Sequence, residues 1–422
     1  MKYQLGLNKY ALLFLLIWSF TNSDAQLSVT DVQGGMIGSS AYFGGQNNLL
    51  KVNGYADFIS PELGVNQPLK NLFGQPISLA QYYSSELGPN ASKSVAWHAP
   101  VSVSFIQKSA EFLPKNWGWS LGLRRTNVGQ AEITNSLIEM AYLGNVKTAG
   151  DTVNLGNNYI NQLSFNSFDI GVIKEFTLFE KPAFWQYGIS LNQGSKLNNL
   201  ALNNAKIYTD EYGEFIDVKY ELTALNNTSA LNGFGFGLNG SLTLQPTENS
   251  ILSISAQNFG YLFWGNGLEQ VSGKVDTEVH GFYLPFSELE NFNDHSVSNH
   301  LDSLQNLVTP DTVSGSARTT IPPFISLNYV TKTSEQFSVF VQLEALPTLS
   351  AYPSIIGGAT YNKGVLLAGA FAGLSKSGDF TSGVRLGFKA NSMFSLLQFN
   401  GIETIVGSTG NAAISLNAGF LF

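Results

Sequence analysis

Hydrophobic and polar residues alternate one by one along much of the chain. In WGWSLGLR, residues 117–124, tryptophan and leucine occupy one parity and glycine, serine and arginine the other. The stretches WQYGISLN (185–192) and FGFGLNGSLTL (234–244) repeat the pattern. Because successive side chains of a strand point to opposite faces, each stretch is predicted to be a β-strand with one apolar and one polar face.

About sixteen stretches carry enough of this alternation to be candidate strands. Two of them, 201–210 and 279–286, have the weakest pattern, and outer-membrane barrels usually have an even number of strands. We therefore expect about 14 strands. The candidate strands cover residues 98–108, 116–126, 162–176, 183–193, 201–210, 214–224, 232–245, 250–259, 279–286, 321–332, 335–346, 353–361, 364–374, 379–390, 393–401 and 412–422.

Alternation alone also fits a soluble β-sandwich, in which the apolar face meets a second sheet. Two details favour a membrane barrel instead. The polar faces carry mainly Ser, Asn, Gly, Gln and Thr, and the apolar faces begin or end with aromatic residues, as a girdle at the bilayer boundary requires. In lipid only a closed sheet satisfies every backbone group. We predict an all-β protein, a transmembrane antiparallel up-and-down β-barrel.

The composition supports this prediction. Charged residues make up 12 % of the chain, about half of the usual share of about 25 % in globular proteins. A hydrophobic content of 44 %, with 30 Phe and 17 Tyr, argues against a disordered chain. The net charge of −8 is dispersed and no basic run is present, which argues against a nucleic-acid partner. The absence of Cys excludes disulfides and thiolate metal sites.

The N-terminus has the features of an export signal. Lys2 and Lys9 precede the apolar run YALLFLLIWSF (10–20), which is too short for a membrane helix of about 20 residues. We predict that residues 1–25 are a signal peptide cleaved after Ala25, with an uncleaved anchor as the alternative. The predicted location is the bacterial outer membrane.

Three further segments depart from the strand pattern. Residues 26–97 are rich in Gly, Asn and Pro, and we expect an N-terminal plug inside the barrel, or a soluble periplasmic cap, before the transmembrane barrel of residues 98–422. SLIEMAYLG (136–144) has helical spacing. The longest excursion, 287–320, carries leucines at helical spacing and is also expected to contain a short helix.

Two passages carry a resemblance to a known family. They are SLIEMAYLGNVKTAGDTVNLG (136–156) and SILSISAQNFGYLFWGNG (250–267). The chain resembles an uncharacterised family of outer-membrane β-barrels from bacteria of the type IX secretion lineage, which is distantly similar to PorV and to fatty-acid-channel barrels. The resemblance implies a barrel over nearly the whole mature chain. Asn258 stands where the family pattern has an acidic residue, so no role for a carboxylate follows there.

The sequence offers little support for catalysis. His295 and His300 are five residues apart in HSVSNH, which does not match the i, i+4 spacing of a helical metal site, and a solvated loop is the favoured interpretation. His98 and His280 begin predicted strands without an assignable acid partner. The Gly-rich stretch 364–375 lacks the lysine of a phosphate-binding loop. We predict no enzyme activity, no metal and no cofactor.

Several charged residues lie opposite well-defined apolar faces. Arg or Lys facing lipid at the midplane costs about 2–4 kcal/mol, so these residues face the lumen or lie beyond the bilayer. They either pair with one another and hold the interior together, or they line a path and hold a polar group of a ligand. The candidate lumen residues are Arg124, Asp169, Glu344, Arg385 and Lys389, with Asp217, Lys219 and Glu221 on one further strand.

Two functional classes follow from these features. In the first, the barrel is a passive channel or an uptake protein for small apolar or amphiphilic molecules. In the second, it is a non-transporting scaffold or accessory subunit of a protein secretion or surface-assembly complex. The expected partners are outer-membrane lipid and the barrel assembly machinery, with secretion-complex proteins added in the second class.

The C-terminal stretch AISLNAGFLF is predicted to be a closing strand that pairs with the first strand of the barrel. Its apolar parity would face lipid and serve as the signal for membrane insertion. The residues assigned to this signal are Ile414, Leu416, Phe420 and Phe422.

We expect Phe422→Asp to impair assembly strongly, because it puts a charge on the lipid-facing parity of this strand. The measurement is the amount of heat-modifiable barrel in the membrane fraction. The control is Phe292→Asp in a predicted loop. Equal yields of both variants would contradict the insertion-signal interpretation.

Overall fold

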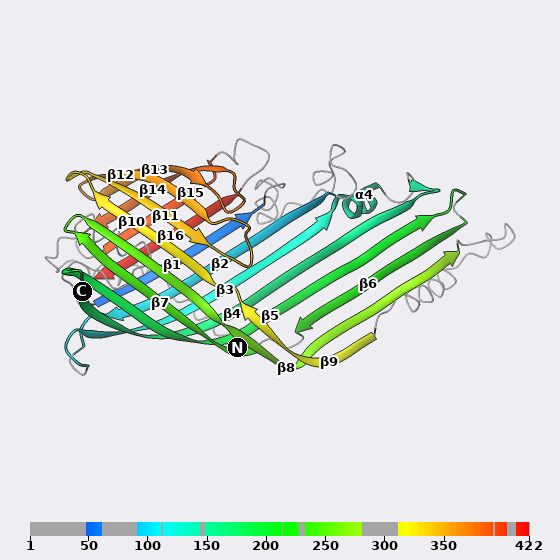
Figure 1. Ribbon diagram of the computed structural model, residues 1–422, viewed down its shortest axis with the longest axis horizontal. Helices are drawn as coiled ribbons and strands as arrows, with labels where there is room; N and C mark the ends of the chain where they lie inside the picture. Colours follow the sequence, from blue (N-terminus) through cyan, green and yellow to red (C-terminus); the bar gives the residue numbers. More distant parts are fainter. Residues whose placement is uncertain are drawn as a thin grey trace, which may run out of the picture.

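One antiparallel sheet makes up almost the whole described chain, with a short helix beside it (Figure 1). The computed structural model describes residues 48–60, 91–110, 113–143, 148–212, 214–227, 233–280, 311–390, 393–402 and 411–421. The elements are β1 Asn48–Ile59, β2 Ser92–Gln107, β3 Trp117–Thr134, α4 Asn135–Leu143, β4 Thr152–Leu178, β5 Lys181–Thr209, β6 Phe215–Asn227, β7 Gly233–Thr247, β8 Ser250–His280, β9 Asp311–Ile321, β10 Phe324–Lys332, β11 Phe337–Ala345, β12 Ser354–Lys363, β13 Leu366–Leu374, β14 Phe380–Ala390, β15 Met393–Asn400 and β16 Ala412–Leu421.

The sheet closes on itself into a barrel. β16 pairs with β1, and β10 pairs with both β8 and β11, so the order of neighbours returns to its start. β6 and β7 share one position between β5 and β8, because they pair with successive parts of these two strands. β9 and β10 share another position, because they pair with successive parts of β8. Sixteen described strands therefore fill fourteen positions around the barrel. The prediction of a barrel with about 14 strands is confirmed.

One half of the barrel has much longer strands than the other. β4, β5 and β8 contain 27, 29 and 31 residues, whereas β11, β13 and β15 contain 9, 9 and 8. Figure 1 shows β4, β5, β6, β8 and β9 running well past the short strands. We call this projecting part of the sheet the extension.

The extension explains where the predicted strand boundaries were wrong. The predicted strands 183–193 and 201–210 are one strand, β5, and 250–259 continues without a break to His280 in β8. β9 forms within the region predicted as the excursion 287–320. In β5 the residues that join the two predicted strands, QGSKLNN (193–199), do not alternate between apolar and polar, so the pattern ended the first predicted strand too early.

The first described strand lies within the segment predicted to be a plug. β1 is part of the wall, where it pairs with β2 on one side and β16 on the other. The sheet therefore begins at Asn48 and not near residue 98. Leu50 and Val52 point outward, while the intervening Lys51 is 4 % exposed and points inward. Residues 1–47 and 61–90, with the predicted signal peptide, lie outside the described residues, as does Phe422.

The wall is apolar outside and polar inside. On β3, Leu121 and Leu123 are exposed by 37 % and 64 %, while Ser120 and Arg124 are buried. On β16, Ile414 and Leu416 are exposed by 47 % and 49 %. This is the arrangement that a barrel needs when its outer face meets lipid and its interior holds polar groups.

The helix α4 forms where helical spacing predicted it. It contains nine residues and follows β3 directly. Within the described residues, no helix has the length and the apolar character needed to cross a membrane. The second predicted helix, within 287–320, falls on residues that are not described.

A β-bulge reverses the facing of residues along β8. The pairing with β7 shifts between Leu238 and Gly240, and Asn258 has a φ of +67°. Before the bulge Ile254 points outward, and after it Phe259 does, which is the opposite parity. Pro322 and Pro323, between β9 and β10, lie opposite the bulge and have no backbone N–H to donate. The bulge in β8 and the break between β9 and β10 therefore lie at the same level of the wall.

Two glycines in the β12–β13 hairpin give a matched test of how closely the strands approach. A Cβ at Gly373 would overlap the carbonyl oxygen of Ile355 and lie 2.7 Å from Cα of Ile356, whereas a Cβ at Gly357 would meet nothing within 3.7 Å. We expect Gly373→Ala to lower the free energy of unfolding by about 1–3 kcal/mol, and Gly357→Ala to leave it unchanged or slightly higher. Urea unfolding in lipid vesicles measures both. Equal effects would contradict the close approach.

Candidate functional site

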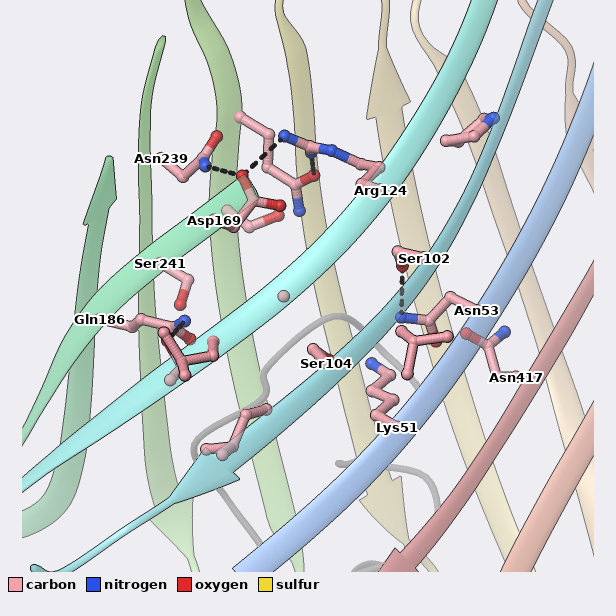
Figure 2. Close-up of a pocket in the computed structure, with 18 of the residues that line it drawn as sticks. Lys51, Asn53, Ser102, Ser104, Arg124, Asp169, Gln186, Asn239, Ser241 and Asn417 are labelled. Carbon is pink, nitrogen blue, oxygen red and sulfur yellow. Dashed lines mark hydrogen bonds and ion pairs between the residues drawn. The ribbon is translucent and has the colours of Figure 1, made fainter. Parts of the chain in front are cut away.

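A polar cavity of about 260 Å³ lies in the lumen of the barrel (Figure 2). Its walls come from strands distant in sequence, namely β1 to β5, β7, β8 and β16. Most of the side chains that line it carry amide, hydroxyl or charged groups. They include Lys51, Asn53, Ser102, Ser104, Arg124, Asp169, Gln186, Asn239, Ser241 and Asn417.

A second cavity of about 170 Å³ adjoins the first. The two share Asn53, Tyr55, Arg124 and Gln257 in their linings. The second extends toward β10, β11, β14 and β15, where its lining includes Asn328, Gln342, Glu344, Arg385 and Gln398. Together the cavities form a continuous polar interior, which we call the lumen site.

Arg124 and Asp169 are brought together at one wall of the lumen site. Arg124 donates from Nη2 to Oδ1 of Asp169 at 3.2 Å and from Nη1 to Oε1 of Gln257 at 3.0 Å. Ser190 also donates to Asp169, and Asn239 donates to it at 3.2 Å. The buried guanidinium and the carboxylate are each bound by several partners, as buried charges require. Figure 2 shows the contacts of Arg124 and Asn239 with Asp169.

Glu344 and Arg385 lie in a second group of polar contacts. Arg385 donates from Nη2 to Oε1 of Gln342 at 2.7 Å, and Nε2 of Gln342 donates to Glu344 at 2.6 Å. The Arg385 guanidinium also lies 3.4 Å from the ring centroid of Phe340. Gln342 thus links the two predicted charges, and the aromatic ring adds a cation–π contact.

A buried lysine outside the strands joins this second group to β1. Lys376, in the turn between β13 and β14, forms ion pairs with Asp57 and, at 3.3 Å, with Glu344. Its ammonium also donates to the hydroxyl of Tyr55 at 2.8 Å. Only 3 % of the Lys376 side chain is exposed. Lys376, Tyr55 and Asp57 were not among the candidate lumen residues, because Lys376 lies between two predicted strands and β1 lies in the segment predicted to be a plug or cap.

Lys51 lines the first cavity, but unlike the arginines of the lumen site it has no partner for its charge among the described residues. Its side chain is buried, and Figure 2 shows it among Asn53, Ser104 and Asn417. Among the described residues, no ion pair or hydrogen bond involves its ammonium group. The alternation of Leu50 and Val52 on either side is the one sequence signal that places Lys51 inside.

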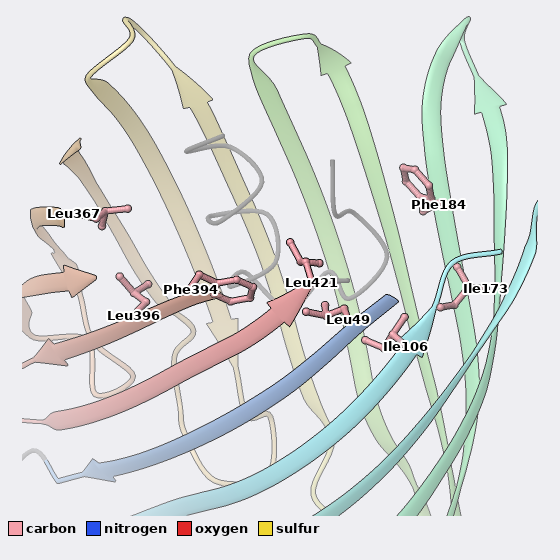
Figure 3. Packing of buried hydrophobic residues seen from close by; sticks show 8 residues of the cluster. All are labelled: Leu49, Ile106, Ile173, Phe184, Leu367, Phe394, Leu396 and Leu421. Atoms are coloured by element: carbon pink, nitrogen blue, oxygen red, sulfur yellow. The ribbon is translucent and has the colours of Figure 1, made fainter. Parts of the chain in front are cut away.

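An apolar cluster adjoins the lumen site at the end of the barrel where short turns join the strands. Figure 3 shows its side chains on the inner side of the wall. Ile106 belongs to this cluster and lines the first cavity, and Leu396 belongs to it and lines the second. The cluster consists of Leu49, Ile106, Ile173, Phe184, Leu367, Phe394, Leu396 and Leu421.

The predicted lumen residues fall into two groups. Arg124, Asp169, Glu344 and Arg385 line the lumen site, while Lys389 lines neither of its two cavities. The charges predicted on a further strand lie on β6, in the extension, and are exposed. There Lys219 forms an ion pair with Asp276 at 2.6 Å, and Glu221 forms one with Lys274 at 3.4 Å. Both ion pairs link β6 to β8. That the lumen residues hold a ligand stays a prediction.

Of the four histidines, His98 and His280 lie within the described residues, and neither belongs to a group that would hold a metal. His98 is buried between the rings of Tyr55 and Phe324, with centroid distances of 5.9 and 5.8 Å. His280 ends β8, and His295 and His300 lie outside the described residues. No group of three His, Asp or Glu that would hold a metal occurs within the described part of the chain.

No protein-family model and no curated protein matches this sequence. Among solved structures, the chain is similar to the Pseudomonas putida toluene transporter TodX, with 11 % identity, a TM-score of 0.48, and coverage of 94 % of this chain and 96 % of that one. It is also similar to the Ralstonia pickettii toluene transporter TbuX, with 9 % identity, a TM-score of 0.46 and coverage of 95 % and 96 %. It is similar as well to a Pseudomonas aeruginosa FadL homologue, with 11 % identity, a TM-score of 0.44 and coverage of 95 % of this chain and 96 % of that one. The resemblance to the type IX secretion lineage and to PorV stays a prediction.

Removing one member of the Arg124–Asp169 pair tests its role in stability. We expect Asp169→Leu to lower the free energy of unfolding by about 3 kcal/mol, because it leaves a buried guanidinium without its counter-ion. The double variant Arg124→Met/Asp169→Leu should recover most of this loss. Urea unfolding in lipid vesicles, followed by tryptophan fluorescence, measures both.

The control is Asp276→Leu, which breaks the exposed pair in the extension and should have little effect. A double variant as unstable as Asp169→Leu alone would contradict the assignment of the cost to an unpaired charge.

Proposed function

We propose that this protein is an outer-membrane barrel that acts as a passive channel or uptake protein for small apolar or amphiphilic molecules. The observation that carries the proposal is the lumen site, a polar interior enclosed by a closed ring of strands with an apolar outer face. The predicted signal peptide supports the outer-membrane location.

The lining of the lumen site favours molecules that have both a polar and an apolar part. Amide, hydroxyl and charged groups line the two cavities, and the apolar cluster meets them at Ile106 and Leu396. A molecule passing this region would exchange hydrogen bonds at the lumen site for apolar contacts at the cluster.

The interruption of the wall at Asn258 and Pro322 supports a route through the barrel. At this level the strand that pairs with β8 changes from β10 to β9. Pro322 and Pro323, which join these two strands, have no backbone N–H to donate. Asn258 lines the second cavity, so the interruption lies beside the lumen site. The wall is therefore irregular at the level where a ligand would be held.

A non-transporting scaffold is the alternative, and the extension is the observation that favours it. The sheet projects beyond the short half of the barrel through β4, β5, β6, β8 and β9 (Figure 1). Such a surface suits contact with a protein of a secretion or surface-assembly complex. The scaffold would be recognised by co-purification of such a complex at a fixed ratio with a barrel that conducts nothing.

A bulky side chain in the cavity tests transport. Gly122 lines the first cavity, whereas the next residue, Leu123, is 64 % exposed on the outer face. We expect Gly122→Trp to fill the cavity and to reduce flux at least tenfold, and Leu123→Trp to leave it unchanged. Single-channel conductance and the swelling of liposomes in 6-aminohexanoate measure the flux. A silent wild-type barrel, or equal flux through both variants, would contradict a route through the lumen site.

A further inference from the structure

We propose that the lumen site binds the carboxylate of a short, hydroxyl-bearing organic acid, with Lys51 as the counter-ion of the carboxylate. The inference rests on the proposed function in that the lumen is the place where small molecules enter. It adds the chemical class of the ligand and the residues that recognise it.

The first support is the unpaired charge of Lys51. The residue is 4 % exposed, and no described residue gives its ammonium an ion pair or a hydrogen bond. A buried ammonium without an anion is costly, and an anionic ligand removes that cost. By contrast, Arg124 is bound by Asp169, and Arg385 by Gln342 and Gln398.

The second support is an unsatisfied acceptor on the same face of β1. Oδ1 of Asn53 is buried and has no hydrogen-bond partner, while its Nδ2 donates to Oγ of Ser102 at 3.4 Å. Asn53 lies two positions after Lys51, so the two side chains point into the same cavity about 7 Å apart along the strand. An acceptor in this position needs a donor such as a hydroxyl group.

The charges around the cavity select an anion over a cation. Three charged residues line the first cavity, and Arg124 is already paired with Asp169. Lys51 therefore leaves this cavity with one positive charge in excess, although the whole chain carries a net charge of −8. A cationic ligand would meet no free carboxylate here.

The size and lining of the first cavity favour a short polar ligand there over a long acyl chain. The first cavity measures about 260 Å³, below the roughly 300–1,000 Å³ of sites for drug-sized ligands. Ser104 and Asn417 lie beside Lys51 in Figure 2 and supply further hydrogen-bonding groups. Hydroxyl groups on the ligand would satisfy these side chains, and methylene groups would not.

Binding of gluconate, with glucose as its uncharged counterpart, tests the proposal. Isothermal titration of the detergent-solubilised full-length barrel should show one gluconate site and at least tenfold weaker binding of glucose. Lys51→Gln should weaken gluconate binding at least tenfold, and Lys51→Arg should restore most of it. Heat modifiability on gels confirms that each variant is folded.

The matched control is Lys389→Gln, which removes the same charge from a residue that lines neither cavity. Gluconate binding that is equal in wild type and Lys51→Gln overturns the proposal, and so does tighter binding of dodecanoate than of gluconate. A conductance measurement tests the proposed transport function separately from the proposed gluconate site. A conducting barrel without a Lys51-dependent gluconate site refutes the inference alone, whereas a silent barrel that binds gluconate refutes only the transport function.

Discussion

The structure depends on closing the backbone hydrogen-bond ladder around the barrel. Lipid offers no partner for an N–H or C=O group, so each strand in the wall must find one on both sides. The pairing of β1 with β16 provides this at one seam, where Asn53 lies opposite Asn417, and the pairing of β10 with β8 provides it at another. Every side chain of the lumen site is held in place by strands that this closure fixes.

β1 combines the closing of the barrel with the construction of its interior. Its inward-facing residues contact two distant parts of the wall. Asn53 donates to Ser102 on β2, and Tyr55 and Asp57 meet Lys376 in the turn after β13. Because side chains alternate along a strand, the residues that line the lumen are fixed by the same register that pairs β1 with β16.

The sequence predicts what local periodicity can show and misses what depends on distant partners. Strands with a lipid-facing aromatic parity, such as β3 and β16, were recognised, and with them Arg124 and Asp169 as inward-facing charges. β1 was assigned to a plug or cap because the segment 26–97 around it is rich in Gly, Asn and Pro. The position of Lys376 is decided by Asp57, 319 residues earlier, which no local pattern reveals. The continuous length of β5 and β8 was missed because alternation fades in the extension.

The pairing of β1 with β16 also sets the order in which the protein has to fold. These strands lie at opposite ends of the described chain, so the contact between them is of the longest range that the fold contains. Until β16 arrives, β1 presents an open edge of unpaired backbone groups, the kind of edge on which chains associate wrongly. The stage before β1 and β16 pair is therefore the one at which this edge is exposed to aggregation.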